Sequence, residues 1–222
     1  MRVLIVEHQR DAPAGLVEAW ATARGLEIDV LRPAEGDAWP QGGEHDAVIA
    51  LGSDCSVARS SQPWIADEIA YLRAAHDARV PVLGLCFGAQ ALAAALGGSV
   101  GRAAHPEIGW CHFDAVDERF AGPFFEWHED AFTVPPGAEA LARSSAGPQA
   151  FRHGLSVGVQ FHPEVDEAIV EAWLDWGRDQ LLAANLDQAE IRRDSAELLD
   201  DARRRAFALF DLWAAAWVPA RH

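Results

Sequence analysis

This chain contains no lysine. All 18 of its basic residues are arginines, and its 34 acidic residues bring the formal net charge to −16. Without lysine there is no lysine Schiff base and no Walker-type phosphate-binding lysine, which excludes pyridoxal-phosphate attachment and P-loop nucleotide hydrolysis. The excess of negative charge repels a phosphate backbone and so disfavours nonspecific binding to nucleic acids.

Cysteine and long apolar runs are also scarce. The three cysteines, Cys55, Cys86 and Cys111, are odd in number and irregularly spaced, which fits neither a disulfide framework nor a CxxC metal site. No run approaches the roughly 18 apolar residues of a membrane-spanning helix, and the run at residues 3–6 is too short for a signal peptide. We therefore expect reduced thiols, a cytoplasmic location, and no membrane or nucleic-acid partner.

Half of the residues are hydrophobic, which is enough for a sizeable core. Short β-branched apolar runs alternate with helical patterns along the first part of the chain. Strands are expected at residues 2–6, 26–31, 47–51 and 80–85, and helices at 13–24, 63–78 and 89–96. This alternation predicts an α/β fold with an open, mostly parallel sheet flanked by helices.

The second part of the chain has a different pattern. Shorter segments that read as more antiparallel strands lie at residues 109–115, 124–127, 150–152 and 155–161. Helical spacing of large apolar residues follows from residue 166 onward. We expect residues 1–182 to form the main domain and residues 183–222 to form a C-terminal helical extension packed on it.

The segment GLCFGAQ, residues 84–90, joins a predicted buried strand to a predicted helix. It is the cysteine counterpart of the G-x-S-x-G nucleophile elbow, whose strained turn projects the nucleophile into a crevice. Side chains two positions from Cys86 would collide in such a turn, which explains Gly84 and Gly88. Amides at the start of the following helix then stabilise a thiolate or an oxyanion. The alternative, a small buried cysteine beside helix-packing glycines, fits this context less well.

His162 is the candidate general base for Cys86. It follows the apolar run 157–159, within the segment QFHPEV. Residues i and i+2 of an extended segment point the same way, so Glu164 lies on the His162 side of the chain. A carboxylate there fixes the imidazole tautomer and stabilises imidazolium, as the third member of a triad does.

Together the two motifs resemble the signatures of the class I, triad-type glutamine amidotransferases. The resemblance runs from the first strand to about residue 180, and ALGS at residues 50–53 occupies the place of the family's oxyanion turn. PEIGW at 106–110, WH at 127–128 and PPGA at 135–138 are similar to stand-alone members related to the amidotransferase half of GMP synthase. The resemblance implies a flavodoxin-like amidotransferase fold with a small antiparallel portion and C-terminal helices.

The resemblance also implies an activity, the hydrolysis of the glutamine side-chain amide to glutamate and ammonia. Cys86 would form a γ-glutamyl thioester, His162 would transfer protons, and Glu164 would orient His162. The oxyanion would rest on the backbone N–H of Phe87 and that of Ser53 or Gly52. The residues implied to bind glutamine are Gln90, Trp127, His128 and Glu129. No cofactor is implied.

Two positions depart from the family pattern. Gly52-Ser53-Asp54 stands where relatives usually have Gly-Gly-Pro, and the loss of the second glycine removes conformational freedom. We therefore expect glutamine or a partner to organise the oxyanion hole. Glu129 follows His128 where many relatives have glycine, and we expect its carboxylate to repel the carboxylate of the substrate.

Other histidines and the tryptophans are expected to be structural. A metal site would need Cys111 with His112, or His105 with Glu107, to converge with a third ligand on one ion, and we expect none. The histidines expected to face solvent or bond locally are His8, His45, His76, His153 and His222. Trp39 and Trp64 are candidates to flank the crevice. The tryptophans expected to pack helices are Trp173, Trp176, Trp213 and Trp217.

Several functions stay open. No adenylating motif is recognisable, so ammonia would pass to a separate synthetase subunit as acceptor. A γ-glutamyl-amide hydrolase would use the same triad with a larger leaving-group pocket. The changes at Ser53 and Glu129 also allow a catalytically weak regulatory or binding subunit. A cysteine-elbow protein of the deglycase and intracellular-protease type fits less well, because it does not need the His-Pro-Glu segment.

Overall fold

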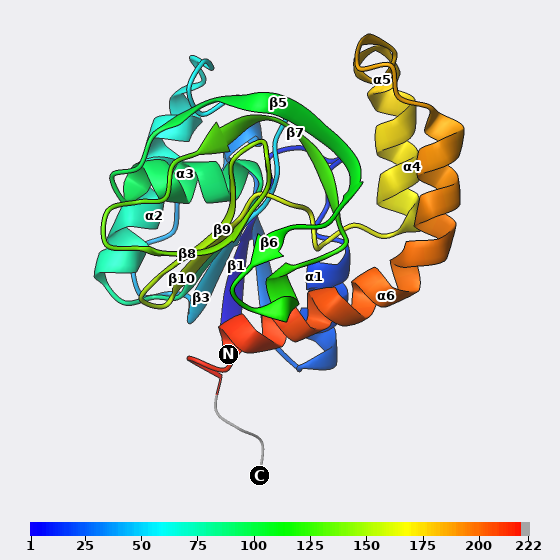
Figure 1. Ribbon diagram of the computed structural model, residues 1–222. Helices are drawn as coiled ribbons and strands as arrows, with labels where there is room; N and C mark the ends of the chain where they lie inside the picture. The colour runs from blue at the N-terminus through cyan, green and yellow to red at the C-terminus, as the bar shows by residue number, and fades with distance from the viewer. Residues whose placement is uncertain (219–222) are drawn as a thin grey trace.

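An eight-stranded sheet forms the centre of the computed structural model, which describes residues 1–218 (Figure 1). Its strand order is β2-β1-β3-β4-β10-β9-β8-β6. The parallel strands are β2 (Glu27–Leu31), β1 (Arg2–Val6), β3 (Ala47–Ala50), β4 (Val82–Leu85) and β10 (Ser156–Val159). The antiparallel strands are β9 (Pro148–His153), β8 (Glu139–Arg143) and β6 (Asp114–Ala115). The predicted open, mostly parallel sheet is confirmed.

A second sheet has two long antiparallel strands, β5 (Val100–Cys111) and β7 (Phe124–Phe132). In Figure 1 this ribbon arches over the carboxyl ends of the parallel strands. It is the small antiparallel portion expected from the resemblance, but β5 begins nine residues before the segment predicted at 109–115. Its first half carries mostly exposed and half-exposed residues, so no apolar alternation marked it in the sequence.

Two strands differ from the sequence predictions. The segment at 155–161 was expected to be antiparallel, but β10 pairs in parallel with β4 and antiparallel only with β9. This places the segment that follows β10 beside the segment that follows β4. Strand β8 was not predicted, because its sequence EALAR has the composition of a helix.

Helices cover both faces of the central sheet. On one face lie α1 (Leu16–Ala23) and α6 (Gln188–Ala214), where Trp20 packs against Phe210 and Trp213. On the other lie α2 (Pro63–Asp77) and α3 (Phe87–Ala95). Short 3₁₀ turns occur at Pro33–Glu35 and Glu118–Phe120. Residues 219–222, which include His222 and the end of the predicted extension, lie outside the described residues.

Two further helices stand beside the two-stranded sheet: α4 (Glu167–Trp176) and α5 (Arg178–Ala183). Ile169, Trp173 and Leu174 of α4 form an apolar cluster with Phe125 of β7. This cluster fixes α4 next to the segment that carries His162. Among residues 1–218, no helix combines the length and apolar character that crossing a membrane requires.

Candidate active site

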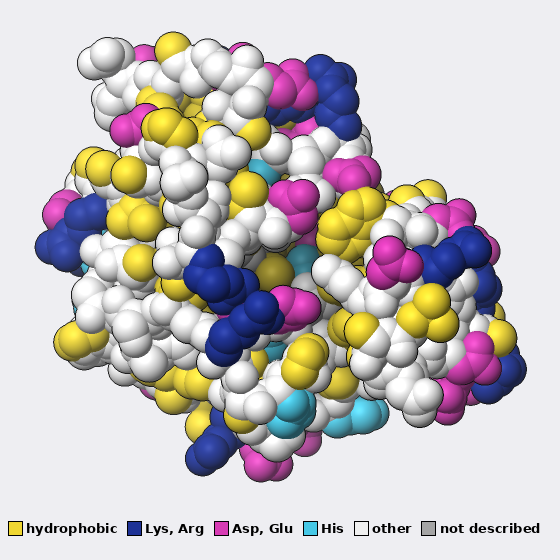
Figure 2. Space-filling model, turned by 90° about the horizontal axis from the view of Figure 1, so that it is seen from above, with side chains coloured by type: hydrophobic (Ala, Val, Ile, Leu, Met, Phe, Trp, Pro, Cys, Tyr) yellow, Lys and Arg dark blue, Asp and Glu magenta, His cyan; other side chains and the backbone are white. Residues whose placement is uncertain are grey.

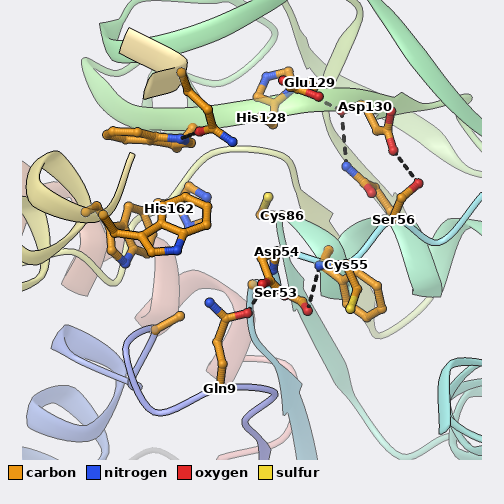
Figure 3. A pocket seen from close by; sticks show the side chains of 18 of the residues that line it. Gln9, Ser53, Asp54, Cys55, Ser56, Cys86, His128, Glu129, Asp130 and His162 are labelled. Carbon is orange, nitrogen blue, oxygen red and sulfur yellow. Dashed lines mark hydrogen bonds between the residues drawn. The ribbon is translucent and has the colours of Figure 1, made fainter. Parts of the chain in front are cut away.

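Cys86 lies on a strained turn between β4 and α3. Its φ of 49° is one that side chains rarely allow, and its N–H donates to the carbonyl oxygen of Val159 over 2.8 Å. A Cβ atom on Gly84 would lie 2.5 Å from the carbonyl oxygen of Gly88, so a side chain does not fit there. The turn expected from GLCFGAQ is thus present, with the thiol at the floor of a pocket (Figure 3).

His162 is paired with Glu164. The imidazole Nδ1 donates to Glu164 Oε1 over 2.6 Å, and His162 lines the same pocket as Cys86. The main-chain N–H of His162 donates to the carbonyl oxygen of Phe125 over 2.8 Å, and the Trp173 ring packs edge-on against the imidazole. All three side chains, Cys86, His162 and Glu164, are buried.

The charges around His162 favour its protonated form. Burial by itself would lower the pKa of His162, because imidazolium loses its hydration. Interactions with Glu164 and Cys86 outweigh burial and raise the pKa well above its ordinary value. A positively charged imidazole is the kind of neighbour that activates a cysteine nucleophile.

The turn at residues 52–54 faces this pair. A Cβ atom on Gly52 would lie 3.1 Å from His162 Cε1 and 3.9 Å from Cys86 Cβ. Ser53 is not among the non-glycine residues of 1–218 with positive φ, so the serine fits without backbone strain. The Asp54 N–H donates to Gln9 Oε1 over 2.8 Å. The Gln9 side chain therefore holds one end of the turn, and the expectation that glutamine or a partner organises the oxyanion hole stays a prediction.

Comparisons with known proteins agree with this arrangement of the site. The family model described as glutamine amidotransferase class-I matches residues 21–169, more than half of the chain. The chain belongs to this family. A glutamine amidotransferase from Thermotoga maritima of known structure aligns with a TM-score of 0.88 and 25% identity, over 96% of this chain and 97% of that one. A glutamine amidotransferase from Methylobacillus flagellatus aligns with a TM-score of 0.89 and 27% identity, over 100% and 97%.

Relatives by sequence include both long and short proteins. A GMP synthase of Thermus thermophilus is 37% identical over 147 residues, which cover 57% of this chain and 27% of that protein. The chain likewise covers only 21% of the GMP synthase of Aeropyrum pernix. A glutamine amidotransferase-like protein of Salmonella typhimurium is 29% identical over 201 residues, covering 83% of this chain and 84% of that protein.

The pocket of this amidotransferase gathers nearly all the residues proposed from the sequence. Figure 2 looks down on its face, where a hollow is bordered by acidic, basic and hydrophobic side chains. The predicted residues that line it are Gly52, Ser53, Cys86, Phe87, Gln90, Trp127, His128, Glu129 and His162. Glu164 is not a lining residue but bonds to the imidazole of His162.

Gln160 belongs to the site and was not proposed from the sequence. Its side-chain Nε2 lies 3.5 Å from the Cys86 sulfur, and its Oε1 accepts from Gln90 Nε2 over 3.2 Å. Gln90 also donates to the carbonyl oxygen of Asp130 over 3.1 Å. Gln160 is two positions before His162, so the alternation of an extended segment was the signal that could have found it.

Aromatic side chains line one side of the pocket. Trp127, Trp173 and Trp176 all contribute, and the Trp176 side chain is half exposed. The expectation that Trp176 packs between helices is therefore wrong. Trp64, a candidate to flank the crevice, instead stacks on His8 with ring centroids 5.1 Å apart.

Two acidic residues at the pocket, Glu129 and Asp130, pair with arginines. Arg102 of β5 bonds to the Glu129 carboxylate, and Arg59 and Ser56 both bond to Asp130. Arg102 therefore partly neutralises the charge of Glu129, and the repulsion of a substrate carboxylate stays a prediction.

A buried cluster behind the pocket contains Glu107, Glu126 and His128, whose ligand-type atoms lie within 4.8 Å of one another. This set differs from both metal combinations considered from the sequence. Burial, reinforced by the charge of Glu107, raises the pKa of Glu126 well above its ordinary value. Although burial would raise it, hydrogen bonds from His128 and Ser144 lower the pKa of Glu107.

The environment of His8 was also not predicted. We expect this residue from the sequence to face solvent or to bond locally, but it is 5% exposed and bonds to Gly52, 44 residues along the chain. No local pattern reveals a contact of this kind, because it forms only where the ends of parallel strands meet.

Proposed function

We propose that this protein is a glutaminase of the amidotransferase type, which converts glutamine and water to glutamate and ammonia. The observation that carries the proposal is that Cys86 and His162 line one pocket and that the buried His162 bonds to Glu164. A thiol, a base and a carboxylate in this order are the parts that acyl transfer by a cysteine nucleophile requires.

The chemistry follows in two stages. The Cys86 sulfur attacks the side-chain carbonyl carbon of glutamine, and His162 gives a proton to the departing ammonia. A γ-glutamyl thioester remains on Cys86. His162 then takes a proton from water, whose oxygen attacks the thioester and releases glutamate and the thiol. Glu164 keeps the imidazole in the orientation and tautomer that both stages need.

Backbone donors complete the site. Phe87 is the first residue of α3, so its N–H has no partner within the helix and is available to an oxyanion. The N–H of Ser53, on the opposite wall, is the second donor. Each such donor contributes about 3 kcal/mol to the transition state of acyl transfer. Gln90, Trp127, His128 and Glu129 remain the proposed residues for seating glutamine.

Covalent labelling with a glutamine-like diazo ketone tests the nucleophile. We expect one equivalent on Cys86, measured by intact mass, and loss of both labelling and glutamate release in Cys86→Ser. Cys55→Ser and Cys111→Ser are the controls. Burial raises the pKa of Cys55, and burial, the largest cause, raises that of Cys111 to about 12. Labelling that persists in Cys86→Ser would overturn the proposal. Labelling without turnover would favour a binding or regulatory subunit.

We also propose that the ammonia passes to a separate acceptor enzyme. Relatives from Saccharolobus solfataricus and Thermococcus kodakarensis are each named as one subunit of a glutamine-hydrolysing GMP synthase, which favours a partner synthetase subunit for this chain as well. Co-purification tests this point: a synthetase that stimulates glutamate release supports it, and turnover unaffected by every co-purifying synthetase contradicts it.

A γ-glutamyl-amide hydrolase is the second candidate, favoured by the aromatic wall of Trp127, Trp173 and Trp176. These rings would accept an aromatic leaving group more readily than ammonia. The two functions separate on kcat/KM for glutamine against γ-glutamyl-anilide. Faster turnover of the anilide, lost selectively in Trp176→Ala, would establish the second candidate in place of the first.

A further inference from the structure

His8 holds the backbone of the proposed oxyanion turn. It follows β1, and its Nδ1 donates to the carbonyl oxygen of Gly52 over 2.9 Å. Its Nε2 lies 2.7 Å from Glu68 Oε2 on α2. Because a carbonyl and a carboxylate are both acceptors, both ring nitrogens donate, and the imidazole is positively charged. Burial would lower the pKa of His8, but the charge of Glu68 and the bonds to Glu68 and Gly52 raise it.

The ring is fixed on every side. The Trp64 ring stacks on it, and the Phe87 ring contacts its edge with centroids 4.8 Å apart. The side chains of His8 and Glu68 are completely buried. Oxygen Oε1 of Glu68 has no hydrogen-bond partner among residues 1–218. The hydrogen bond of this carboxylate to His8 is therefore made through Oε2. A buried ion pair is costly to desolvate and adds little stability over apolar residues, which indicates a role other than stability.

The geometry of a peptide bond connects this contact to the pocket. The C=O of Gly52 and the N–H of Ser53 belong to one peptide group, which is trans, so the two point in opposite directions. Gly52 and Ser53 line the pocket, whereas His8, which bonds to the Gly52 carbonyl, is not a lining residue. With the carbonyl held by His8, the Ser53 N–H is directed to the pocket side. Glycine at position 52 would otherwise allow this peptide to rotate and to present its carbonyl oxygen to the oxyanion.

We propose that His8, held by Glu68, is a positioning residue that fixes the Gly52–Ser53 peptide with its N–H toward the oxyanion of the reacting amide. The inference rests on the proposed glutaminase function. It also explains how the turn works with serine in place of the second glycine: the orientation comes from a side chain of another strand and not from backbone freedom.

Two substitutions separate the two bonds of His8. The amide nitrogen of asparagine reaches about the position of Nδ1, and that of glutamine about the position of Nε2. His8→Asn therefore keeps a donor for Gly52, whereas His8→Gln keeps a donor for Glu68. We expect His8→Gln to lower kcat by about 10²- to 10³-fold, as loss of one oxyanion donor does, and His8→Asn to lower it by less than about 10-fold. Equal losses, or a larger loss in His8→Asn, would overturn the inference.

Further readouts separate positioning from folding. Iodoacetamide alkylates a thiolate without forming an oxyanion, so its rate at Cys86 should be the same in His8→Gln and the parent. A glutamine-like aldehyde forms a thiohemiacetal whose oxygen occupies the hole. We expect its affinity to fall by about 10²-fold in His8→Gln. Glutamine itself should bind with equal affinity to Cys86→Ala and to the double variant that carries Cys86→Ala and His8→Gln. Parallel losses of alkylation and of glutamine binding would indicate only a structural role.

A crystal structure of His8→Gln decides the point independently of activity. We expect the carbonyl oxygen of Gly52 to turn toward the pocket. An unchanged peptide would contradict the inference even if the parent hydrolyses glutamine. A parent that hydrolyses no γ-glutamyl amide would contradict the proposed function, and the peptide orientation in the variant would still test His8.

Discussion

Gly88 of α3 lies against the backbone of Ala50, the last residue of β3: a Cβ atom at Gly88 would be 2.1 Å from the Ala50 carbonyl oxygen. The Gly88 N–H also donates to the carbonyl oxygen of Leu51 over 3.0 Å. The helix that begins at the proposed nucleophile is thus pressed directly onto the strand that leads to the oxyanion turn. The separation of the two walls of the pocket depends on this contact.

Gly88→Ala should therefore damage the site. The added methyl group forces α3 and β3 apart, and we expect a loss of about 1–3 kcal/mol in the free energy of unfolding, together with slower glutamine turnover. Urea denaturation and kcat measure the two effects. Gly101→Ala is the matched control, since nothing lies within 4 Å of a Cβ atom there. A Gly88→Ala protein as stable and active as Gly101→Ala would show that the walls tolerate separation.

Glu164→Gln should leave the fold intact and slow catalysis. An amide nitrogen facing Nδ1 of His162 favours the wrong tautomer, and in a serine-protease triad such a change lowers kcat by about 10⁴-fold. Loss of the carboxylate also removes a charge that raises the pKa of His162, so NMR titration of the imidazole should show a lower pKa. The exposed Glu167 offers a control, Glu167→Gln. Equal kcat values for the two variants would exclude Glu164 from the triad.

Glu126→Gln should stabilise the protein increasingly as the pH rises. The folded protein holds the Glu126 proton to well above its ordinary pKa, because of burial and the charge of Glu107, whereas the unfolded chain loses it near pH 4 to 5. Between those two pKa values the parent loses about 1.4 kcal/mol of stability per pH unit, and the neutral glutamine does not.

Urea denaturation of the parent and of Glu126→Gln from pH 4 to pH 8 measures this difference, with the exposed Glu18→Gln as the control. A gain in Glu126→Gln that is independent of pH would mean that the folded protein ionises Glu126 as readily as the unfolded chain.

Phe210→Ala tests whether α6 belongs to the main folding unit. Phe210 is fully buried, and its ring centroid lies 5.6 Å from that of Trp20 on α1. We expect a single unfolding transition with stability lowered by about 3–5 kcal/mol. Leu182→Ala, at a side chain that is 72% exposed, should change stability by less than about 0.5 kcal/mol. Two separate transitions in the parent would show that the predicted extension folds on its own.

Local sequence patterns found the parts of the site that depend on local sterics. Gly84 and Gly88 mark the turn around Cys86 because only a missing Cβ allows the close approaches measured there. Glu164 was placed beside His162 because side chains two positions apart in an extended segment share a side. The buried strands were also found from a local pattern, because a strand covered on both faces reads as an unbroken apolar run.

Contacts between distant segments escaped prediction. Gln160 lies near the Cys86 sulfur because β10 pairs with β4 in parallel, a pairing that no residue of either strand specifies. A charged residue such as Glu126 is typical of the exposed face of a strand. Its side chain is nevertheless fully buried, because β7 turns this face toward the triad. Trp176 has the spacing of a packing residue, and only the position of α4 beside the pocket makes it a lining residue.

The sequence by itself determined a nucleophile turn, a base with its carboxylate, and a parallel sheet, because steric limits and the two-residue strand period act over a few neighbouring residues. The tertiary structure alone decided that His8 and Glu68 meet behind Gly52. Their bonds span 44 and 60 residues of chain and exist only because the end of β1, the end of β3 and a face of α2 converge at one edge of the sheet.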